Sequence, residues 1–301
     1  MEIEEFTTKQ FERLEPLKLA DDVTSIESNL FKLPEKVNVN KKVLKRYKKI
    51  DGNYFGNKLL TINALIDYKD QIGIEELVYP EKVAVVNKEL VGFTMELIEN
   101  NHNLSTLLNS KEITTREKIK LLKQVESIIE KVQYIKDLSK PFYLADIHES
   151  NFILNNDDKK VYAVDLDGCK ISNNEIFTMK YGSFNEKFFE FPHKYPLDEC
   201  DNPIPNANTE WYCFAIMILN TITDGPFYKL TLEDFYNYMF YLKRRGFPNE
   251  LLDYFNSIYC NSKNYAPKDI LDLIPNDLNK FSFSEFLDET GKKEKYKLYK
   301  K

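Results

Sequence analysis

Residues 144–170 read L-A-D-I-H-E-S-N-F-I-L-N-N-D-D-K-K-V-Y-A-V-D-L-D-G-C-K, and they hold the most informative pattern of polar residues in the chain. The turn N-N-D-D-K-K separates two short β-like runs, and Asn and Asp favour such turns because their side chains hydrogen-bond to nearby backbone groups. The turn therefore folds the chain back and is expected to bring Asn151 near Asp165. Asp146 stands at the other end of the loop that finishes at Asn151. A loop acid and amide facing an acid at a strand end can hold a divalent metal and phosphate oxygens.

The bulk composition is that of a globular chain with a moderate acidic excess. At 301 residues it is long enough for two lobes, and 43% hydrophobic residues suffice for a buried core. A net charge of −6 argues against a general nucleic-acid binder, which usually carries a basic excess. The four cysteines show no C-x-x-C pair, so they indicate neither a zinc site nor a disulfide framework. The N-terminus lacks an apolar signal core, and no run approaches the roughly 20 apolar residues of a membrane span. We therefore expect a cytoplasmic protein with reduced thiols.

The residue pattern divides the chain into four parts and predicts an α+β protein. Residues 1–22 are polar with spaced apolar positions, which indicates an amphipathic helix or an arm lying on the body. Residues 23–98 have the character of strands with one helix, and residues 99–275 are mainly helical in pattern. Residues 276–301 are expected to form a polar tail that ends in a lysine-rich segment.

The strand-rich part has the order of three strands, one helix and two strands. Alternation and β-branched residues predict the strands, and Leu59, Ile62, Leu65 and Ile66 fall on one helical face. The expected strands lie within 23–33, 36–39, 41–47, 77–86 and 89–97, with a helix over 54–66 and a turn at 87–89.

The mainly helical part contains a long amphipathic helix at 113–135. From Leu121 onward its apolar residues recur at three- and four-residue steps, which makes a stripe that faces the core. Residues 170–207 are irregular and contain four prolines, and a long loop inside a compact domain is usually functional. Further helices are expected at 103–108, 208–222, 231–245 and 248–259.

The spacing of Asp146, Asn151 and Asp165 resembles the D-x-x-x-x-N and D-F-G segments of protein-kinase-like phosphotransferases. The resemblance implies a two-lobed fold, with a small antiparallel β lobe that carries one helix and a larger, mainly helical lobe. It implies ATP and Mg²⁺ in the cleft between the lobes. Asp146 would accept the proton of the substrate hydroxyl, and Asn151 and Asp165 would hold Mg²⁺. Residues 170–207 occupy the position of the kinase activation segment.

The resemblance also assigns nucleotide-binding positions. Lys45 matches the strand lysine that holds ATP phosphates, with Lys48 as its rival. The loop that covers the phosphates corresponds to residues 25–32, where Ser28 and Asn29 would partly substitute for glycine. The linker that joins the lobes would bind adenine through its backbone, and its first residue would gate the adenine pocket. It corresponds to Met95, Glu96, Leu97 and Ile98.

Some positions depart from the kinase pattern in the strand-rich part and after it. Residues 25–32 contain no glycine, although glycine normally lets backbone amides approach phosphate closely. No glutamate lies between Ile50 and Gly73 to pair with the strand lysine, and Asp67 is the candidate if the helix is shifted. The sequence D-L-D-G replaces D-F-G. Its extra acid, Asp167, either adds a metal contact or caps the following turn, and we expect the cap.

The surroundings of Asp146 point to a subclass. Leu144 and Ala145 replace the His-Arg of many protein kinases. The arginine that usually binds a phosphorylated activation segment is therefore absent. His148 stands where protein kinases usually have lysine, and D-x-H-x-x-N is similar to aminoglycoside and choline phosphotransferases. We count His148 as a catalytic candidate, with a loop-stabilising hydrogen bonder as the alternative. Glu210, in E-W-Y-C-F-A, resembles the acid of the kinase D-x-W-S-x-G helix, which hydrogen-bonds amides of the catalytic loop.

The sequence therefore predicts an ATP- and Mg²⁺-dependent phosphotransferase, and a divergent serine/threonine protein kinase is the leading interpretation. A small-molecule kinase of the aminoglycoside or choline type and a nucleotide-binding pseudokinase are the alternatives. Transfer of AMP rather than phosphate is also open. We expect a protein substrate more than a small molecule, and no nucleic-acid or membrane partner.

Overall fold

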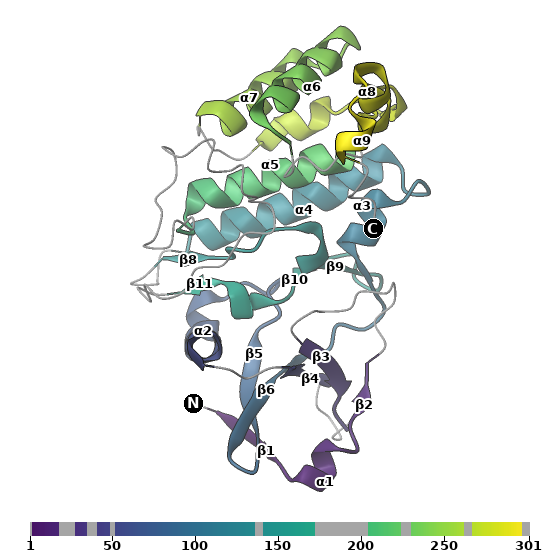
Figure 1. Ribbon diagram of the computed structural model, residues 1–301. Helices are drawn as coiled ribbons and strands as arrows, with labels where there is room; N and C mark the ends of the chain where they lie inside the picture. Colours follow the sequence, from purple (N-terminus) through teal and green to yellow (C-terminus); the bar gives the residue numbers. More distant parts are fainter. Residues whose placement is uncertain are drawn as a thin grey trace. The chain divides into compact units, whose positions relative to one another are not determined.

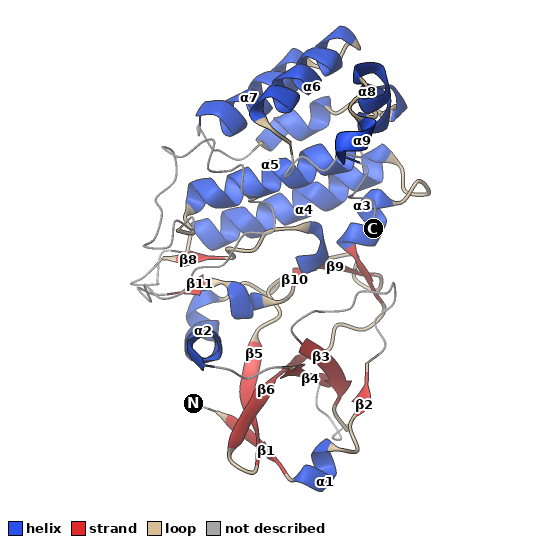
Figure 2. Cartoon of the chain, viewed as in Figure 1, coloured by secondary structure: helices blue, strands red, loops and turns tan. Residues whose placement is uncertain are grey.

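The computed structural model of the chain describes residues 2–17, 28–34, 41–48, 52–135, 141–171, 204–223, 230–261 and 267–296. The chain divides into two compact units (Figure 1). The first, called the β unit below, comprises Met1–Asn103, Lys131–Leu144 and Asn151–Phe177. The second, called the helical unit, comprises Leu104–Glu130, Ala145–Ser150 and Thr178–Lys301. The named strands lie in the β unit and the chain as a whole is α+β (Figure 2).

The β unit is organised on a mixed six-stranded sheet with the strand order β1-β5-β6-β4-β3-β2. Its strands are β1 (Ile3–Phe6), β2 (Glu15–Pro16), β3 (Ser28–Lys32), β4 (Lys42–Tyr47), β5 (Pro80–Val86) and β6 (Glu89–Glu96). β1 runs parallel to β5, whereas the other neighbours are antiparallel. The expectation of an antiparallel sheet is therefore wrong at this edge, because the N-terminal segment adds a parallel strand there.

The N-terminal segment is part of the sheet rather than an arm laid on the body. After β1 the short helix α1 (Thr8–Phe11) begins with a capping box between Thr7 and Gln10. β2 then pairs with β3 at the opposite edge. Phe6 is buried with Leu44 and Ala84 on one face of the sheet. The burial of this aromatic side chain explains why the segment belongs to the β unit.

The predicted hairpin and helix of the β unit are both present. Asn87 and Lys88 join β5 to β6 and have φ values of 50° and 67°, as the tight turns that match strand twist require. Helix α2 (Gly52–Ile72) places Ile62 in a core cluster with residues of β4, β5 and β6. The members of this cluster are Val43, Tyr47, Ile62, Val78, Val83, Phe93 and Met95.

Two small sheets complete the β unit, and one contains the predicted turn at 155–160. β7 (Asn101–Asn103), β9 (Phe152–Asn155) and β10 (Val161–Ala163) form the first sheet, and β8 (Phe142–Tyr143) pairs with β11 (Lys170–Ile171) in the second. The hairpin β9–β10 is antiparallel, as expected. The Ala163 amide donates to the Glu76 carbonyl at 2.8 Å, and its carbonyl accepts from the Val78 amide at 3.0 Å. These hydrogen bonds join the hairpin to the β unit. The division expected from the sequence, with parts at 23–98 and 99–275, assigned the hairpin to the mainly helical part.

The helical unit contains the helices that the sequence predicts. α5 is buried along most of its length and packs against α7, while α6 packs against α7 and α8. The predicted stripe of α4 is buried at Leu121, Leu122, Val125, Ile128 and Ile129. The helices are α3 (Leu104–Asn109), α4 (Thr115–Gln133, with its last turn counted in the β unit), α5 (Ala207–Thr223), α6 (Leu232–Arg244), α7 (Asn249–Asn261), α8 (Phe283–Thr290) and α9 (Lys293–Tyr296).

The segment from residue 276 differs from the expected polar tail. Phe281, Phe283 and Phe286 are buried, and the last two meet the Tyr238 ring edge-to-face at centroid distances of 5.2 and 4.9 Å. The lysines that follow bind a buried acid, since Lys292 and Lys295 both form ion pairs with Asp234. These buried aromatic residues therefore make this segment part of the folded body.

Two expectations lie outside the described residues. They are the strand at 36–39 and the irregular segment over residues 172–203. Within the part of the chain that the structure describes, no helix combines the length and the apolar character that a membrane crossing requires.

Candidate functional site

Strand β4 carries Lys45 on the face of the sheet that packs against α2. Successive side chains of a strand point to opposite faces, so Lys45 shares a face with Val43 and Tyr47, which belong to the core cluster that includes Ile62 of α2. Lys45 is only 5% exposed, whereas Lys48 is exposed after the strand ends. The strand geometry thus places Lys45, rather than its rival, inside the β unit.

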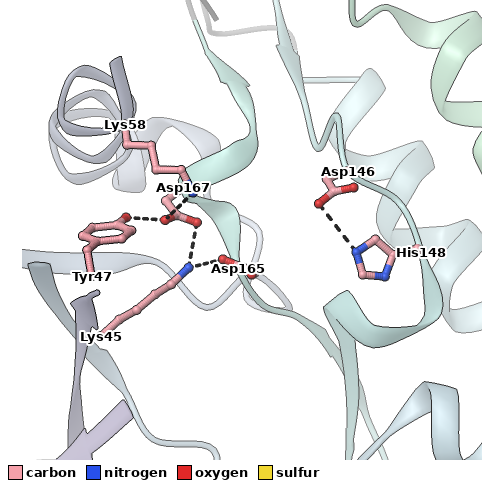
Figure 3. A network of polar contacts seen from close by, with 7 residues as sticks. All are labelled: Lys45, Tyr47, Lys58, Asp146, His148, Asp165 and Asp167. Atoms are coloured by element: carbon pink, nitrogen blue, oxygen red, sulfur yellow. Dashed lines mark hydrogen bonds and ion pairs between the residues drawn. The ribbon is translucent and has the colours of Figure 1, made fainter. Parts of the chain in front are cut away.

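Two carboxylates from the segment after β10 bind the ammonium group of Lys45 (Figure 3). Lys45 Nζ forms an ion pair with Asp165 and a second one with Asp167 at 2.9 Å. Asp165 has φ 64° and ψ 40°, a left-handed conformation that is uncommon for a residue with a Cβ atom. The sequence assigned Lys45 and Asp165 to one site, and the fold brings them together across 120 residues.

Asp167 is the buried centre of this polar network. Its side chain is 1% exposed, its Oδ2 atom accepts a hydrogen bond from the Tyr47 hydroxyl, and Lys58 Nζ lies 3.4 Å from the same oxygen. The expectation that Asp167 caps the following turn is wrong, because its oxygens bind side chains of β4 and α2. Asp167 itself lies inside a short 3-10 helix, Leu166–Gly168.

Lys58 is the site residue that sequence reasoning missed. It is 3% exposed, and its Nζ lies 5.5 Å from the ring centroid of Tyr47, within the range of a cation–π contact. Lys58, Ile62 and Leu65 follow one another at four- and three-residue steps, so the lysine falls on the buried stripe of α2. That position was the available signal. Asp67, the candidate partner of Lys45 if the helix were shifted, is exposed on α2.

The network shifts the pKa values of its members in opposite directions. Burial alone would lower the pKa of Lys45, but the charges of Asp165 and Asp167 outweigh burial and raise it. Burial would raise the pKa of Asp167, but Lys45, the Asp165 side chain, Lys58 and Tyr47 hold it well below its usual range. Burial and the neighbouring Asp167 raise the pKa of Asp165 to about 6 against the opposing charge of Lys45. Because 44% of the Asp165 side chain is exposed, solvent weakens the effect of burial there. Asp167 is therefore the firmly ionised partner, and Asp165 is the carboxylate that protonates more easily.

Gly92 on β6 allows β4 to approach at the level of Lys45. A Cβ atom on Gly92 would lie 1.8 Å from the Lys45 carbonyl oxygen and 2.9 Å from its carbonyl carbon. Real Cβ atoms do not approach backbone atoms this closely, so only glycine fits between the strands here. The backbone position of the site lysine thus depends on a residue that the sequence analysis did not select.

Asn151 and Asp165 flank the hairpin β9–β10, and the amide of Val164 donates to the carbonyl of Asn151 at 2.9 Å. Mg²⁺ takes hard oxygen ligands, keeps several waters and needs only one or two carboxylates. The half-exposed Asp165 carboxylate is an oxygen ligand of that kind, and the backbone hydrogen bond brings Asn151 beside the residue that precedes it. Among the described residues, no group of three or more His, Cys, Asp or Glu side chains is arranged to hold a metal. The fit therefore depends on Asp165 with Asn151 and not on a cluster of acids.

In the helical unit, Asp146 and His148 face each other within one loop (Figure 3). His148 Nε2 lies 3.5 Å from Asp146 Oδ2, and His148 Nδ1 accepts a hydrogen bond from the Ser150 amide at 3.2 Å. Because Nδ1 is the acceptor, the neutral imidazole carries its proton on Nε2, the atom that faces the acid. Both sequence candidates of this loop are thus brought together, with the histidine ring oriented by the backbone.

Glu210 supports the same loop from the first turn of α5. Asn206 begins this helix, since its Oδ1 atom accepts from the amides of Asn208 at 2.8 Å and Thr209 at 3.2 Å. Glu210 is buried, and its Oε1 atom accepts a hydrogen bond from the Ala145 amide at 3.3 Å. The contact between an acid of this helix and an amide of the loop, expected from the resemblance, is therefore present.

The residues expected to cover the phosphates lie partly in a strand. In the linker expected to bind adenine, some backbone groups already have hydrogen-bond partners. Ser28 and Asn29 lie within strand β3, opposite Tyr47 and Arg46 of β4, because the alternating run pairs with that strand. The rest of the expected phosphate loop, residues 25–27, lies outside the described residues.

In the linker, Met95 is buried in the core of the sheet and Glu96 is exposed at the end of β6. The Leu97 amide donates to the Lys41 carbonyl at 2.8 Å, and the Ile98 carbonyl accepts from the Asn101 side chain. These two backbone groups therefore already have partners within the chain.

The chain was compared with protein-family models and with curated proteins, and none of either matches it.

Proposed function

We propose that the chain is an ATP- and Mg²⁺-dependent phosphotransferase with a divergent, protein-kinase-like fold. The observation that carries the proposal is the ion pair between Lys45 and Asp165. A nearly buried strand lysine meets an acid at the end of a hairpin, and these are the groups that hold phosphate and metal in that class of enzyme. The order of strands and helices in the chain adds support.

The proposed roles follow from the chemistry of each group. Lys45 would bind phosphate oxygens of ATP, and Asp165 with Asn151 would hold Mg²⁺. The metal would supply positive charge that neutralises the negative charge developing during transfer. Asp146 accepts the proton of the acceptor hydroxyl. The hydroxyl oxygen of the acceptor forms the new bond to the γ-phosphorus, and ADP departs as the leaving group. General-base catalysis of this kind typically contributes about 10²–10⁴-fold to the rate.

A serine or threonine hydroxyl on a protein is the proposed acceptor, in a cytoplasmic setting. Glu210 supports this choice, because its contact with the Ala145 amide matches the protein-kinase arrangement. A small-molecule acceptor is the second candidate, and the observation that favours it is His148 beside Asp146. The D-x-H-x-x-N spacing of these residues is the one similar to aminoglycoside and choline phosphotransferases.

The test is the transfer of label from ATP in the presence of Mg²⁺. Wild type is compared with Lys45→Met, Asp146→Asn and Asp165→Asn, and Lys48→Met serves as the matched control because that lysine is exposed. Label from the γ-phosphate reports phosphoryl transfer, and label from the α-phosphate reports AMP transfer.

We expect γ-label on a protein acceptor with wild type and Lys48→Met, and little with the three site variants. Equal labelling in all five proteins would refute the proposed site. ATP consumption that depends on an added aminoglycoside or amino alcohol, with no protein labelled, would decide for the second candidate. Nucleotide binding without turnover would identify a pseudokinase.

A further inference from the structure

Three charged side chains of the β unit are nearly completely buried at one point. Lys45 of β4 is 5% exposed, Lys58 of α2 is 3% exposed, and Asp167 is 1% exposed at the side chain. Burying charged groups is costly unless they are paired, and buried ionisable groups with specific partners mark functional sites more often than others. This buried charge cluster is therefore a candidate for a functional role in addition to packing.

The carboxylate of Asp167 is shared between the two lysines. Its Oδ1 atom lies 2.9 Å from Lys45 Nζ, and its Oδ2 atom lies 3.4 Å from Lys58 Nζ and accepts from the Tyr47 hydroxyl. One acid thus joins β4, α2 and the segment after β10. Figure 3 shows the side chains of Lys45, Tyr47 and Lys58 converging on it.

The two acids that bind Lys45 differ in their surroundings. Asp165 keeps 44% of its side chain exposed, whereas Asp167 is enclosed by Lys45, Lys58 and Tyr47. Asp165 is therefore accessible to a metal, and the oxygens of Asp167 are already committed to protein donors. A metal that engages Asp165 would leave Lys45 still held by Asp167.

We propose that Asp167 is the positioning residue of Lys45 and that Lys58 is the cation on α2 that fixes Asp167 in turn. In the arrangement that the kinase resemblance implies, an acid on the helix pairs with the strand lysine. Here the two charges are exchanged. The helix supplies a cation, and the segment after β10 supplies the acid. This inference rests on the proposed function, since it states how the phosphate-binding lysine of that site is held.

A charge relocation tests the proposal. Asp167→Asn removes the shared carboxylate with little change of shape, and Lys58→Glu places an acid on α2 where a lysine reached the same oxygens. The double variant restores one lysine facing one carboxylate, now from the helix. Asp165→Asn is the comparison for loss of a metal ligand. The affinity for ATP is measured at saturating Mg²⁺, the Mg²⁺ dependence at saturating ATP, and unfolding of every variant in urea.

We expect each single variant to bind ATP more weakly. The double variant should bind ATP more tightly than is predicted by multiplying the fold-losses in affinity of the two single variants. Coupling between contacting residues is commonly about 2- to 150-fold. Asp167→Asn should leave the Mg²⁺ dependence near that of wild type, whereas Asp165→Asn should shift it.

Each contrary result overturns the proposal in a distinct way. Losses that multiply in the double variant would show that positions 58 and 167 do not act together. A shift in Mg²⁺ dependence with Asp167→Asn, at unchanged ATP affinity, would make Asp167 a metal ligand. Changes in unfolding alone would make the network structural only. If wild type binds no nucleotide, the proposed function fails and the positioning role falls with it, whereas wild-type binding with unaffected variants refutes only the positioning role.

Discussion

The Glu210 carboxylate accepts a hydrogen bond from the amide of Ala145, and Ala145 has a positive φ of 67°. Left-handed backbone costs a residue with a Cβ atom roughly 1–2 kcal/mol, so such a conformation persists only where its surroundings hold it. Glu210 lies in the first turn of α5, where the helix dipole favours a negative charge. The contact therefore fixes the backbone immediately before Asp146.

Glu210→Ala removes this acceptor and should lower the free energy of unfolding by about 1–3 kcal/mol, the usual cost of an unsatisfied buried group. Glu210→Gln keeps an oxygen at the same place and should cost clearly less. Urea unfolding followed by circular dichroism measures both. An equal loss in the two variants would mean that the Ala145 contact is not what Glu210 contributes.

His148→Asn separates the two contacts of the histidine. Asparagine can still accept from the Ser150 amide, as His148 Nδ1 does at 3.2 Å, but it removes the Nε2 group that lies 3.5 Å from Asp146. We expect near wild-type stability and a rate of the proposed phosphoryl transfer about tenfold lower, equivalent to the loss of one polar contact of ~1.4 kcal/mol.

His148→Ala is the matched variant for that experiment, since it removes both contacts. It should lose stability as well as rate. A His148→Asn protein with full activity would assign the histidine to loop stabilisation alone, the alternative interpretation of this residue.

Lys88→Gly should stabilise the β5–β6 hairpin. Asn87 and Lys88 both have positive φ, and Asn-Gly is the preferred pair in turns of this kind. Lys88 is exposed, so its removal disturbs no core packing. We expect the free energy of unfolding to rise by about 1 kcal/mol, measured in urea. Lys88→Ala keeps the Cβ atom and should give no such gain, so a gain with alanine would place the cause elsewhere.

Local pattern was sufficient for the parts of the site that lie in regular structure. Alternation predicts β4 and so turns Lys45 toward α2, and the turn at 155–160 predicts the hairpin that ends at Asp165. Glu210 was found through the resemblance of E-W-Y-C-F-A to a kinase helix, and the densely apolar run that follows predicts the helix on which it lies. In each case neighbours in the sequence determine the direction of the side chain.

The parts that could not be predicted depend on distant partners. A lysine in a helix is normally exposed, so the position of Lys58 on the apolar stripe of α2 does not reveal its partner, Asp167, which lies 109 residues away. β1 is short, acidic and parallel to a strand about 80 residues later, and its own sequence shows no alternation that would reveal this pairing. The buried aromatics Phe281, Phe283 and Phe286 were hidden among polar neighbours.

The C-terminal lysines should stabilise the helical unit through Asp234. This acid is buried in the first turn of α6, and Lys292 and Lys295 both bind it. Removal of residues 292–301 takes away both partners, and we expect a loss of about 1–3 kcal/mol, below the cost for a fully buried pair because the lysines are partly exposed.

Asp234→Asn in the shortened chain provides the control for that truncation. Neutralising the acid should recover part of the loss there, while the same change in the full chain should destabilise it. Urea unfolding of the four proteins gives the coupling between the acid and the lysines. Equal effects of Asp234→Asn in both chains would refute it.

Gly92→Ala should damage the site without touching any charged group. The new methyl group would meet the Lys45 backbone at 1.8 Å, so β4 and β6 must separate where Lys45 is held. Overpacking of this kind typically costs about 1–3 kcal/mol, and the displaced Lys45 should weaken ATP binding as well.

Gly56→Ala is the matched control, because Gly56 is exposed on α2 with nothing within 4 Å of the added methyl group. Alanine there should stabilise the helix by up to about 1 kcal/mol and leave ATP binding unchanged. Urea unfolding and ATP titration of both variants are the measurements, and unchanged ATP affinity in Gly92→Ala would show that the strand spacing does not position Lys45.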